Sequence, residues 1–126
     1  MAEHARRWRP DRIEGFWWFL FANGGLVAAI FLPVHILVQG ILGPMGWAPV
    51  VDQHYDSFAA VLANPIVKLY LFVIISLPLF HWAHRMRFLL IDLGLTVGQR
   101  PLKYVLYGLA IVGTLLAAYI LVTVPV

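Results

Sequence analysis

Three long stretches of the chain are almost entirely apolar. Asp, Glu, Lys and Arg are absent from Gly15 to Val51, from Leu69 to His84 and from Tyr104 to the end. About 20 apolar residues suffice for a helix to cross the hydrocarbon core of a bilayer. The pattern therefore predicts an all-α membrane protein with three transmembrane helices, at about residues 16–42, 64–90 and 101–124.

Polar, glycine and proline residues separate these segments. Residues 1–14 predict an arginine-rich leader, and residues 43–57 predict a loop with a short interfacial helix before the second span. Asn64 is a candidate helix cap, and Pro65 suits a first helical position. Within the spans, Pro33 predicts tilt or a kink, and Pro78 predicts a local break.

Composition strengthens the membrane assignment. Of 126 residues, 62% are hydrophobic and 12% are charged, against about 25% charged in an ordinary soluble domain. The absence of cysteine excludes disulfides and thiolate-ligated metal or iron–sulfur sites. The first apolar run is too long for a cleaved signal peptide. Basic residues cluster near the membrane ends, so the net charge of +3 is no sign of nucleic-acid binding.

The distribution of Lys and Arg predicts an orientation. The leader holds four arginines, and the second connection with its flanks holds Arg85, Arg87, Arg100 and Lys103. The first loop instead carries two aspartates, with only Lys68 beyond it. Because cytoplasmic segments are enriched in Lys and Arg, the N-terminus is predicted to be cytoplasmic, in a bacterial inner membrane.

This topology places several polar side chains at one depth. Trp18 lies about one turn into the first span, and His84 and Arg85 lie about one to two turns from the cytoplasmic end of the second. Indole, imidazole and guanidinium groups donate hydrogen bonds, which suits a flat apolar ligand with carbonyl oxygens, such as a quinone. A histidine can also relay protons.

Small residues favour contact between these two spans. Asn23, Gly24 and Gly25 predict a close helix approach. His35 lies in mid-span, where a hydrogen bond to a neighbouring helix would satisfy its ring.

Simpler interpretations exist for each residue. Trp17 and Trp18 are typical of the aromatic belt at a membrane interface. Arg85 and Arg87 are typical of topology signals that reach toward headgroups. His84 on its own is as consistent with a hydrogen bond to a partner helix as with function.

With these residues in place, the chain resembles the D subunit of bacterial fumarate reductase, a hydrophobic membrane anchor. The resemblance covers nearly everything after residue 13. It rests on the ordered segments "FWWFLFANGG", Leu32–Pro33, "GILGPMGW", "NPIVKLYLFVIISLPLFHWAHRM", Asp92 and "KYVLYGLA".

The resemblance implies a non-catalytic subunit in a complex of four. The partners are a flavoprotein subunit that interconverts fumarate and succinate, an iron–sulfur subunit and a second anchor, the C subunit of fumarate reductase. The two anchors hold the others at the membrane and bind menaquinone. In that family a Trp and a His-Arg pair of the D subunit contribute to the quinol site, which implies Trp18, His84 and Arg85 here. Phe21 and Ala22 are implied as further pocket residues.

Two positions depart from the best-known members. Trp17 adds an aromatic ring beside Trp18, which leaves open which of the two points inward. His81 and Asp92 keep a spacing that resembles succinate dehydrogenase anchors, where the leading histidine binds haem b. A haem b-carrying anchor, with a second axial ligand from the partner anchor, and a purely structural anchor are therefore the alternative hypotheses.

Overall fold

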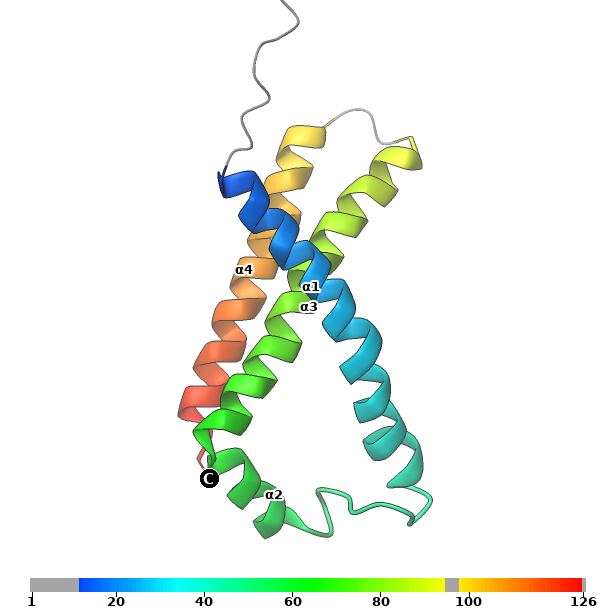
Figure 1. The fold of residues 1–126 in the computed structure, drawn as a ribbon, viewed down its shortest axis with the longest axis vertical. Helices are drawn as coiled ribbons and strands as arrows, with labels where there is room; N and C mark the ends of the chain where they lie inside the picture. Colours follow the sequence, from blue (N-terminus) through cyan, green and yellow to red (C-terminus); the bar gives the residue numbers. More distant parts are fainter. Residues whose placement is uncertain (1–11, 95–97, 126) are drawn as a thin grey trace, which may run out of the picture.

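The computed structural model describes residues 12–94 and 98–125, which fold into a bundle of long helices (Figure 1). Most of the predicted leader and the centre of the second connection lie outside the described residues. The elements in chain order are α1 (Arg12–His35), the π-helix η1 (Ile36–Leu42), α2 (Tyr55–Ala63), α3 (Pro65–Asp92) and α4 (Gln99–Thr123). The described residues contain no strand.

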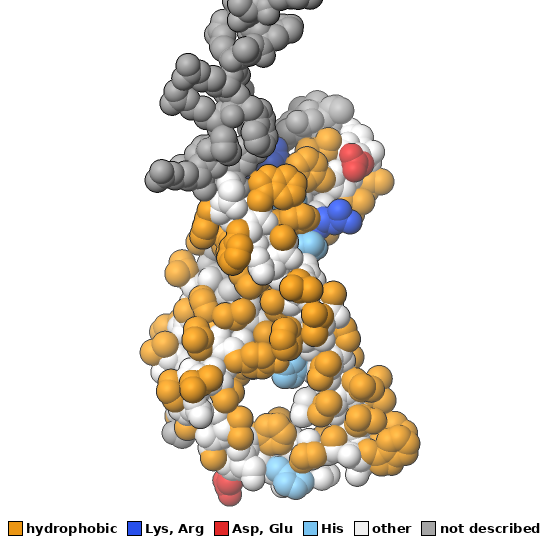
Figure 2. Space-filling model, in the orientation of Figure 1, with side chains coloured by type: hydrophobic (Ala, Val, Ile, Leu, Met, Phe, Trp, Pro, Cys, Tyr) orange, Lys and Arg blue, Asp and Glu red, His pale blue; other side chains and the backbone are white. Residues whose placement is uncertain are grey.

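Three helical segments are long and apolar enough to cross a membrane. They are Gly15–Leu42, Pro65–Asp92 and Pro101–Thr123, with 28, 28 and 23 residues. Hydrophobic side chains cover most of the visible face, and the charged side chains lie near its two ends (Figure 2). The prediction of an all-α membrane protein with three transmembrane helices is confirmed.

The start of α3 is determined locally. Oδ1 of Asn64 accepts a hydrogen bond from the backbone N–H of Ile66 at 2.9 Å, and Pro65 occupies the first helical position. The side chain thus satisfies one of the free N–H groups at the helix start, as predicted. The prediction of a local break at Pro78 is wrong, because α3 continues through this residue to Asp92.

The two prolines within the spans have different surroundings. Pro33 lies near the end of α1, and the backbone changes to the seven-residue π-helix η1 three residues later. A π-helix is a wider turn that is rare in regular helices. The first span is therefore irregular in its second half, close to the predicted position. The predicted short helix before the second span is also present, as α2.

Helix α3 is the centre of the bundle, packed by α1 on one side and by α4 on another. Ala83 of α3 and Ala110 of α4 are fully buried, and Leu106 is 6% exposed between them. In lipid, helices gain little from burying apolar surface, so small residues that permit close backbone contact favour association. These alanines therefore bring α3 and α4 together at the level of His84.

The crossing of α1 and α3 depends on two glycines. A Cβ atom on Gly24 would overlap the carbonyl oxygen of Leu77 and lie 2.9 Å from Cβ of His81. A Cβ atom on Gly25 would lie 2.7 Å from Cε1 of His81. The predicted role of this glycine pair in close helix approach is thus confirmed. Below the crossing α1 and α3 diverge (Figure 1).

A polar contact joins α1 and α3 where the two helices diverge. Nε2 of His35 lies 2.8 Å from the hydroxyl of Tyr70 on α3, and Phe31 packs edge-on against the same tyrosine at 5.8 Å. The expected hydrogen bond from His35 to a neighbouring helix is therefore present.

Replacing Gly24 with alanine is expected to weaken the α1–α3 crossing. The added methyl group meets rigid backbone, and such overpacking costs about 1–3 kcal/mol. The unfolding free energy of the protein in detergent, measured by denaturant titration, should fall by that amount. Gly15→Ala is the matched control, because nothing lies within 4 Å of its added methyl group. Equal stability of the two variants would contradict this packing.

Candidate functional site

The candidate site is centred on His84, near the end of α3 that adjoins the second connection. Its ring packs among three aromatic side chains, with centroid distances of 4.4 Å to Phe21, 5.8 Å to Trp18 and 4.9 Å to Phe88. Phe21 and Trp18 come from α1, so the α1–α3 crossing assembles this cluster. The predicted approach of Trp18 to His84 is present in the structure.

Helix α4 contributes the hydrogen-bond partner of His84. The Nδ1 atom of His84 lies 2.8 Å from the hydroxyl of Tyr107. Trp17 packs edge-on against the Tyr107 ring at 5.6 Å and lies 6.0 Å from the ring of Phe80. The site is therefore built from three helices rather than from the first two spans alone.

A cavity of about 650 Å³ opens beside this cluster. Ligand pockets for small molecules are typically about 300–1,000 Å³. The lining combines aromatic rings, two basic side chains and the apolar side chain of Ile111. Its lining residues are Trp17, Trp18, His84, Arg87, Phe88, Lys103, Tyr104, Tyr107, Gly108 and Ile111.

The structure brings together some of the sequence-predicted residues and separates others. Trp17, Trp18 and His84 line the cavity, so both tryptophans face it. Phe21 packs on His84 without lining the cavity. Arg85 and Ala22 are exposed on the outer surface of the chain and do not line it.

Arg87, interpreted from the sequence as a topology signal, lies in the cavity wall. Its Nε atom is buried without a hydrogen-bond partner among the described residues. Its guanidinium carbon lies 5.4 Å from the centroid of the Phe88 ring, a distance typical of cation–π contact. The cavity wall thus contains a guanidinium group with an N–H that has no hydrogen-bond partner among the described residues.

Five cavity residues come from α4 and were not predicted as site residues, and three of them are polar: Lys103, Tyr104 and Tyr107. The signal was present in "KYVLYG", because residues three and four apart share one helix face. The third span begins at the same end of the bundle as Trp18 and His84, so polar residues in its first turns meet them. Lys103 was considered only as a topology signal.

His81 has a different environment from His84. Its Nδ1 atom donates a hydrogen bond of 2.8 Å to the backbone carbonyl of Phe21. Its ring stacks on the Phe21 ring at 4.7 Å with an interplanar angle of 8°, and Gly25 lies against its edge. His81 therefore fills the α1–α3 crossing.

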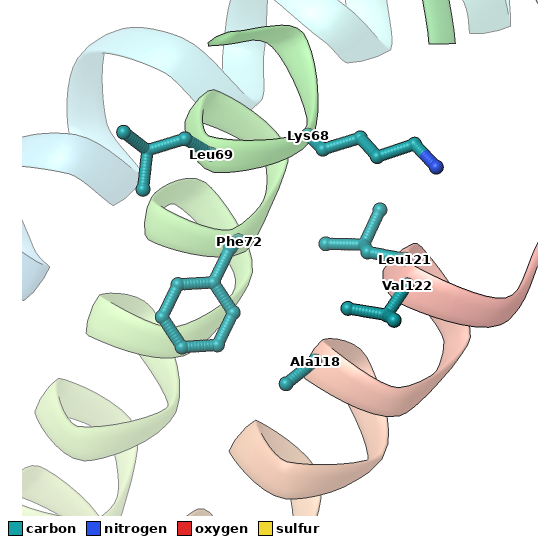
Figure 3. Close-up of a pocket in the computed structure, with 6 residues that line it drawn as sticks. All are labelled: Lys68, Leu69, Phe72, Ala118, Leu121 and Val122. Atoms are coloured by element: carbon teal, nitrogen blue, oxygen red, sulfur yellow. The ribbon is translucent and has the colours of Figure 1, made fainter. Parts of the chain in front are cut away.

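A second, smaller hollow of about 250 Å³ lies between α3 and α4 toward their other ends (Figure 3). Lys68, Leu69 and Phe72 line it from α3. Ala118, Leu121 and Val122 line it from α4. Lys68 is its only titratable group, so it lacks the convergent polar groups of the first cavity. Among the described residues, no cluster of three His, Asp or Glu side chains suits a metal ion.

The comparisons with known proteins agree with this architecture. The family model for the D subunit of fumarate reductase matches residues 9–122. The chain belongs to the fumarate reductase D-subunit family. The fumarate reductase D subunit of Mycobacterium tuberculosis (strain ATCC 25618 / H37Rv) is 40% identical over 119 residues, covering 93% of both chains. That of Shewanella putrefaciens is 38% identical over 104 residues, covering 82% of this chain and 85% of the relative.

The family match covers the whole region from Trp17 to Ile111 that forms the candidate site. The family resemblance inferred from the sequence is thereby confirmed.

His81→Phe is expected to cost about 0.6 kcal/mol and at most about 1.7 kcal/mol of unfolding free energy, the range for hydrogen bonds between membrane helices. Phenylalanine retains an aromatic ring to stack on Phe21 but cannot donate to its carbonyl. Denaturant titration in mixed micelles measures the loss. His54→Phe is the control, because His54 is exposed and makes no side-chain hydrogen bond among the described residues. An unchanged stability of His81→Phe would show that the bond contributes nothing.

Proposed function

We propose that this membrane-embedded anchor of fumarate reductase forms part of a menaquinone site at the His84 cluster. Together with a second anchor, the C subunit, it docks the flavoprotein and iron–sulfur subunits at the membrane. The observation that carries the proposal is the juxtaposition of Trp18, Phe21 and His84 beside a cavity of about 650 Å³. Family membership supports the assembly.

The residues present suit a quinone head group. The rings of Trp17 and Trp18 form flat apolar walls, and the apolar end near Ile111 leaves a route for a prenyl tail. His84 and the indole N–H groups provide hydrogen bonds for carbonyl oxygens. Arg87 adds a cationic donor from the cavity wall. Arg85 is exposed on the isolated chain. We propose that a partner protein covers it and closes the site, so that Arg85 donates a hydrogen bond to the second carbonyl oxygen.

The proposed role of His84 is to accept a proton. Oxidation of a menaquinol to the quinone breaks two O–H bonds and releases two electrons and two protons. The electrons leave to the iron–sulfur subunit, Nε2 of His84 takes up one proton from a quinol hydroxyl, and the second proton passes to water at the membrane surface. A histidine suits this step because its protonation equilibrium lies near neutral pH. We assign the reduction of fumarate itself to the flavoprotein subunit.

The orientation follows from charge. Because the leader and the second connection carry most of the basic residues, we propose that this end of the bundle faces the cytoplasm of a bacterium. The His84 cluster lies toward the same end, where Arg85, Arg87 and Lys103 are available to the hydrophilic subunits. Electrons leaving the quinol then have a short route to an iron–sulfur partner.

We further propose that His81 belongs to the helix crossing and does not bind haem b. An axial haem ligand needs free space around its ligating nitrogen for the porphyrin ring. In this structure Phe21 stacks on one face of the imidazole, and Gly25 lies against its edge. Helix α1 occupies the volume that a porphyrin would need.

Replacing His84 with glutamine or Arg85 with glutamine is expected to lower menaquinol-linked fumarate reduction by at least tenfold. A positioned acid–base group typically contributes about 10²–10⁴-fold, and Arg85 would lose a charge-assisted hydrogen bond. Turnover is measured in the purified four-subunit complex with a menaquinol analogue. Fumarate reduction with an artificial dye should be unchanged, because the dye bypasses the quinone site.

The matched controls are His54→Gln and Lys68→Gln, which remove a histidine and a cation from places remote from the cavity. Both should retain quinol-linked turnover. If the His84 and Arg85 variants also retain it, the chain is a structural anchor whose partner supplies the quinone contacts.

The haem proposal has a direct spectroscopic test. The test is the reduced-minus-oxidised absorption spectrum of the purified complex. Any haem b band in the wild type should persist unchanged in the His81→Phe variant. A haem band present in the wild type and absent in this variant would establish His81 as an axial ligand.

A further inference from the structure

Three histidines of the membrane spans each hydrogen-bond to another helix, but to different kinds of partner. His81 bonds to a backbone carbonyl, whereas His84 and His35 each bond to a tyrosine hydroxyl. A carbonyl oxygen only accepts, so Nδ1 of His81 must carry the proton. A hydroxyl both donates and accepts. His81 is therefore held in one tautomer, while His84 and His35 can adopt either.

This difference matters only at a site where the ring exchanges protons. To accept a proton from a quinol, Nε2 of His84 must be unprotonated, and Nδ1 then donates to the Tyr107 oxygen. To donate to a quinone carbonyl, Nε2 must be protonated. In the neutral ring Nδ1 then accepts from the Tyr107 hydroxyl, whereas in the doubly protonated ring it still donates to the Tyr107 oxygen. The bond of 2.8 Å between Nδ1 and the hydroxyl is compatible with both arrangements. Within the described residues Nε2 makes no hydrogen bond, which leaves it for a ligand.

We propose that Tyr107 is a positioning residue for the menaquinone site, which orients the His84 ring and supports both of its tautomers. The inference rests on the proposed function of His84. The residue that positions His84 is thus provided by α4 and not by the first two spans. The hydroxyl acts through His84 and need not contact the quinone itself.

The packing around Tyr107 holds its hydroxyl in place. Trp17 lies edge-on against the ring at 5.6 Å. On the same helix, the adjacent Leu106 and, one turn on, Ala110 are buried against Ala83 of α3. The distance between α3 and α4 is thus set next to the His84–Tyr107 bond. Trp17, an unexplained extra aromatic in the sequence, is accounted for as a support of Tyr107.

The chain contains its own matched control. His35 and Tyr70 form the same kind of pair, also at 2.8 Å, and neither residue lines the cavity. A hydrogen bond that only joins two helices would make the two pairs equivalent. Tyr107→Phe and Tyr70→Phe each remove one hydroxyl and leave a ring of nearly the same size. Any difference in turnover between them reports on the site rather than on helix packing.

The test uses the intact four-subunit complex and a menaquinol analogue. Tyr107→Phe is expected to lower kcat for quinol-linked fumarate reduction about tenfold, a part of the effect of a positioned general base. The KM for the quinol analogue should change by less than about twofold, because the quinone contacts remain. Dye-linked fumarate reduction should stay at the wild-type rate, and Tyr70→Phe should leave all three parameters unchanged.

A double-mutant cycle shows whether Tyr107 acts through His84. In a His84→Gln background, adding Tyr107→Phe should cause no further loss of turnover, because the group that it positions is gone. A tenfold further loss would overturn the proposal, as would a wild-type kcat for Tyr107→Phe alone. If His84→Gln itself retains quinol-linked turnover, the proposed quinone site fails, and this inference fails with it.

Discussion

The close contact of α1 with α3 at Gly24 and Gly25 is the constraint on which the rest of the site depends. The two glycines carry no side chain at the contact, so the carbonyl of Leu77 and the side chain of His81 lie directly against the α1 backbone. In a bilayer this contact replaces the hydrophobic driving force that water provides to soluble proteins. It also fixes the depth of the aromatic residues of α1 against α3, which brings Trp18 to His84.

The aromatic cluster then depends on a second contact, between α3 and α4. Buried alanines at positions 83 and 110 allow these helices to approach, and Tyr107 reaches Nδ1 of His84 across the gap. The glycines place the α1 backbone against α3, and the alanines are buried beside the tyrosine side chain that reaches His84. Together they place His84 between an apolar wall and a hydroxyl.

The sequence predicted some features of this structure and not others. The helix cap at Asn64 and the hydrogen bond of His35 were predictable, because the first depends on neighbouring residues and the second on an unsatisfied ring in an apolar segment. The position of Arg85 relative to Arg87 was not. Two residues along a helix differ by about 200° in direction, so only one of this pair lines the cavity, and α3 has no strongly polar face that predicts which one.

By itself the sequence determined the three apolar spans, the start of α3 at Pro65 and the family, since each follows from composition or from residues near one another in the chain. Only the tertiary structure decided that both Trp17 and Trp18 face one cavity and that Tyr107 is the partner of His84. These facts depend on the rotation of each helix about its axis. In a span that is apolar on all sides, hydrophobicity does not specify that rotation, and contacts between small residues do.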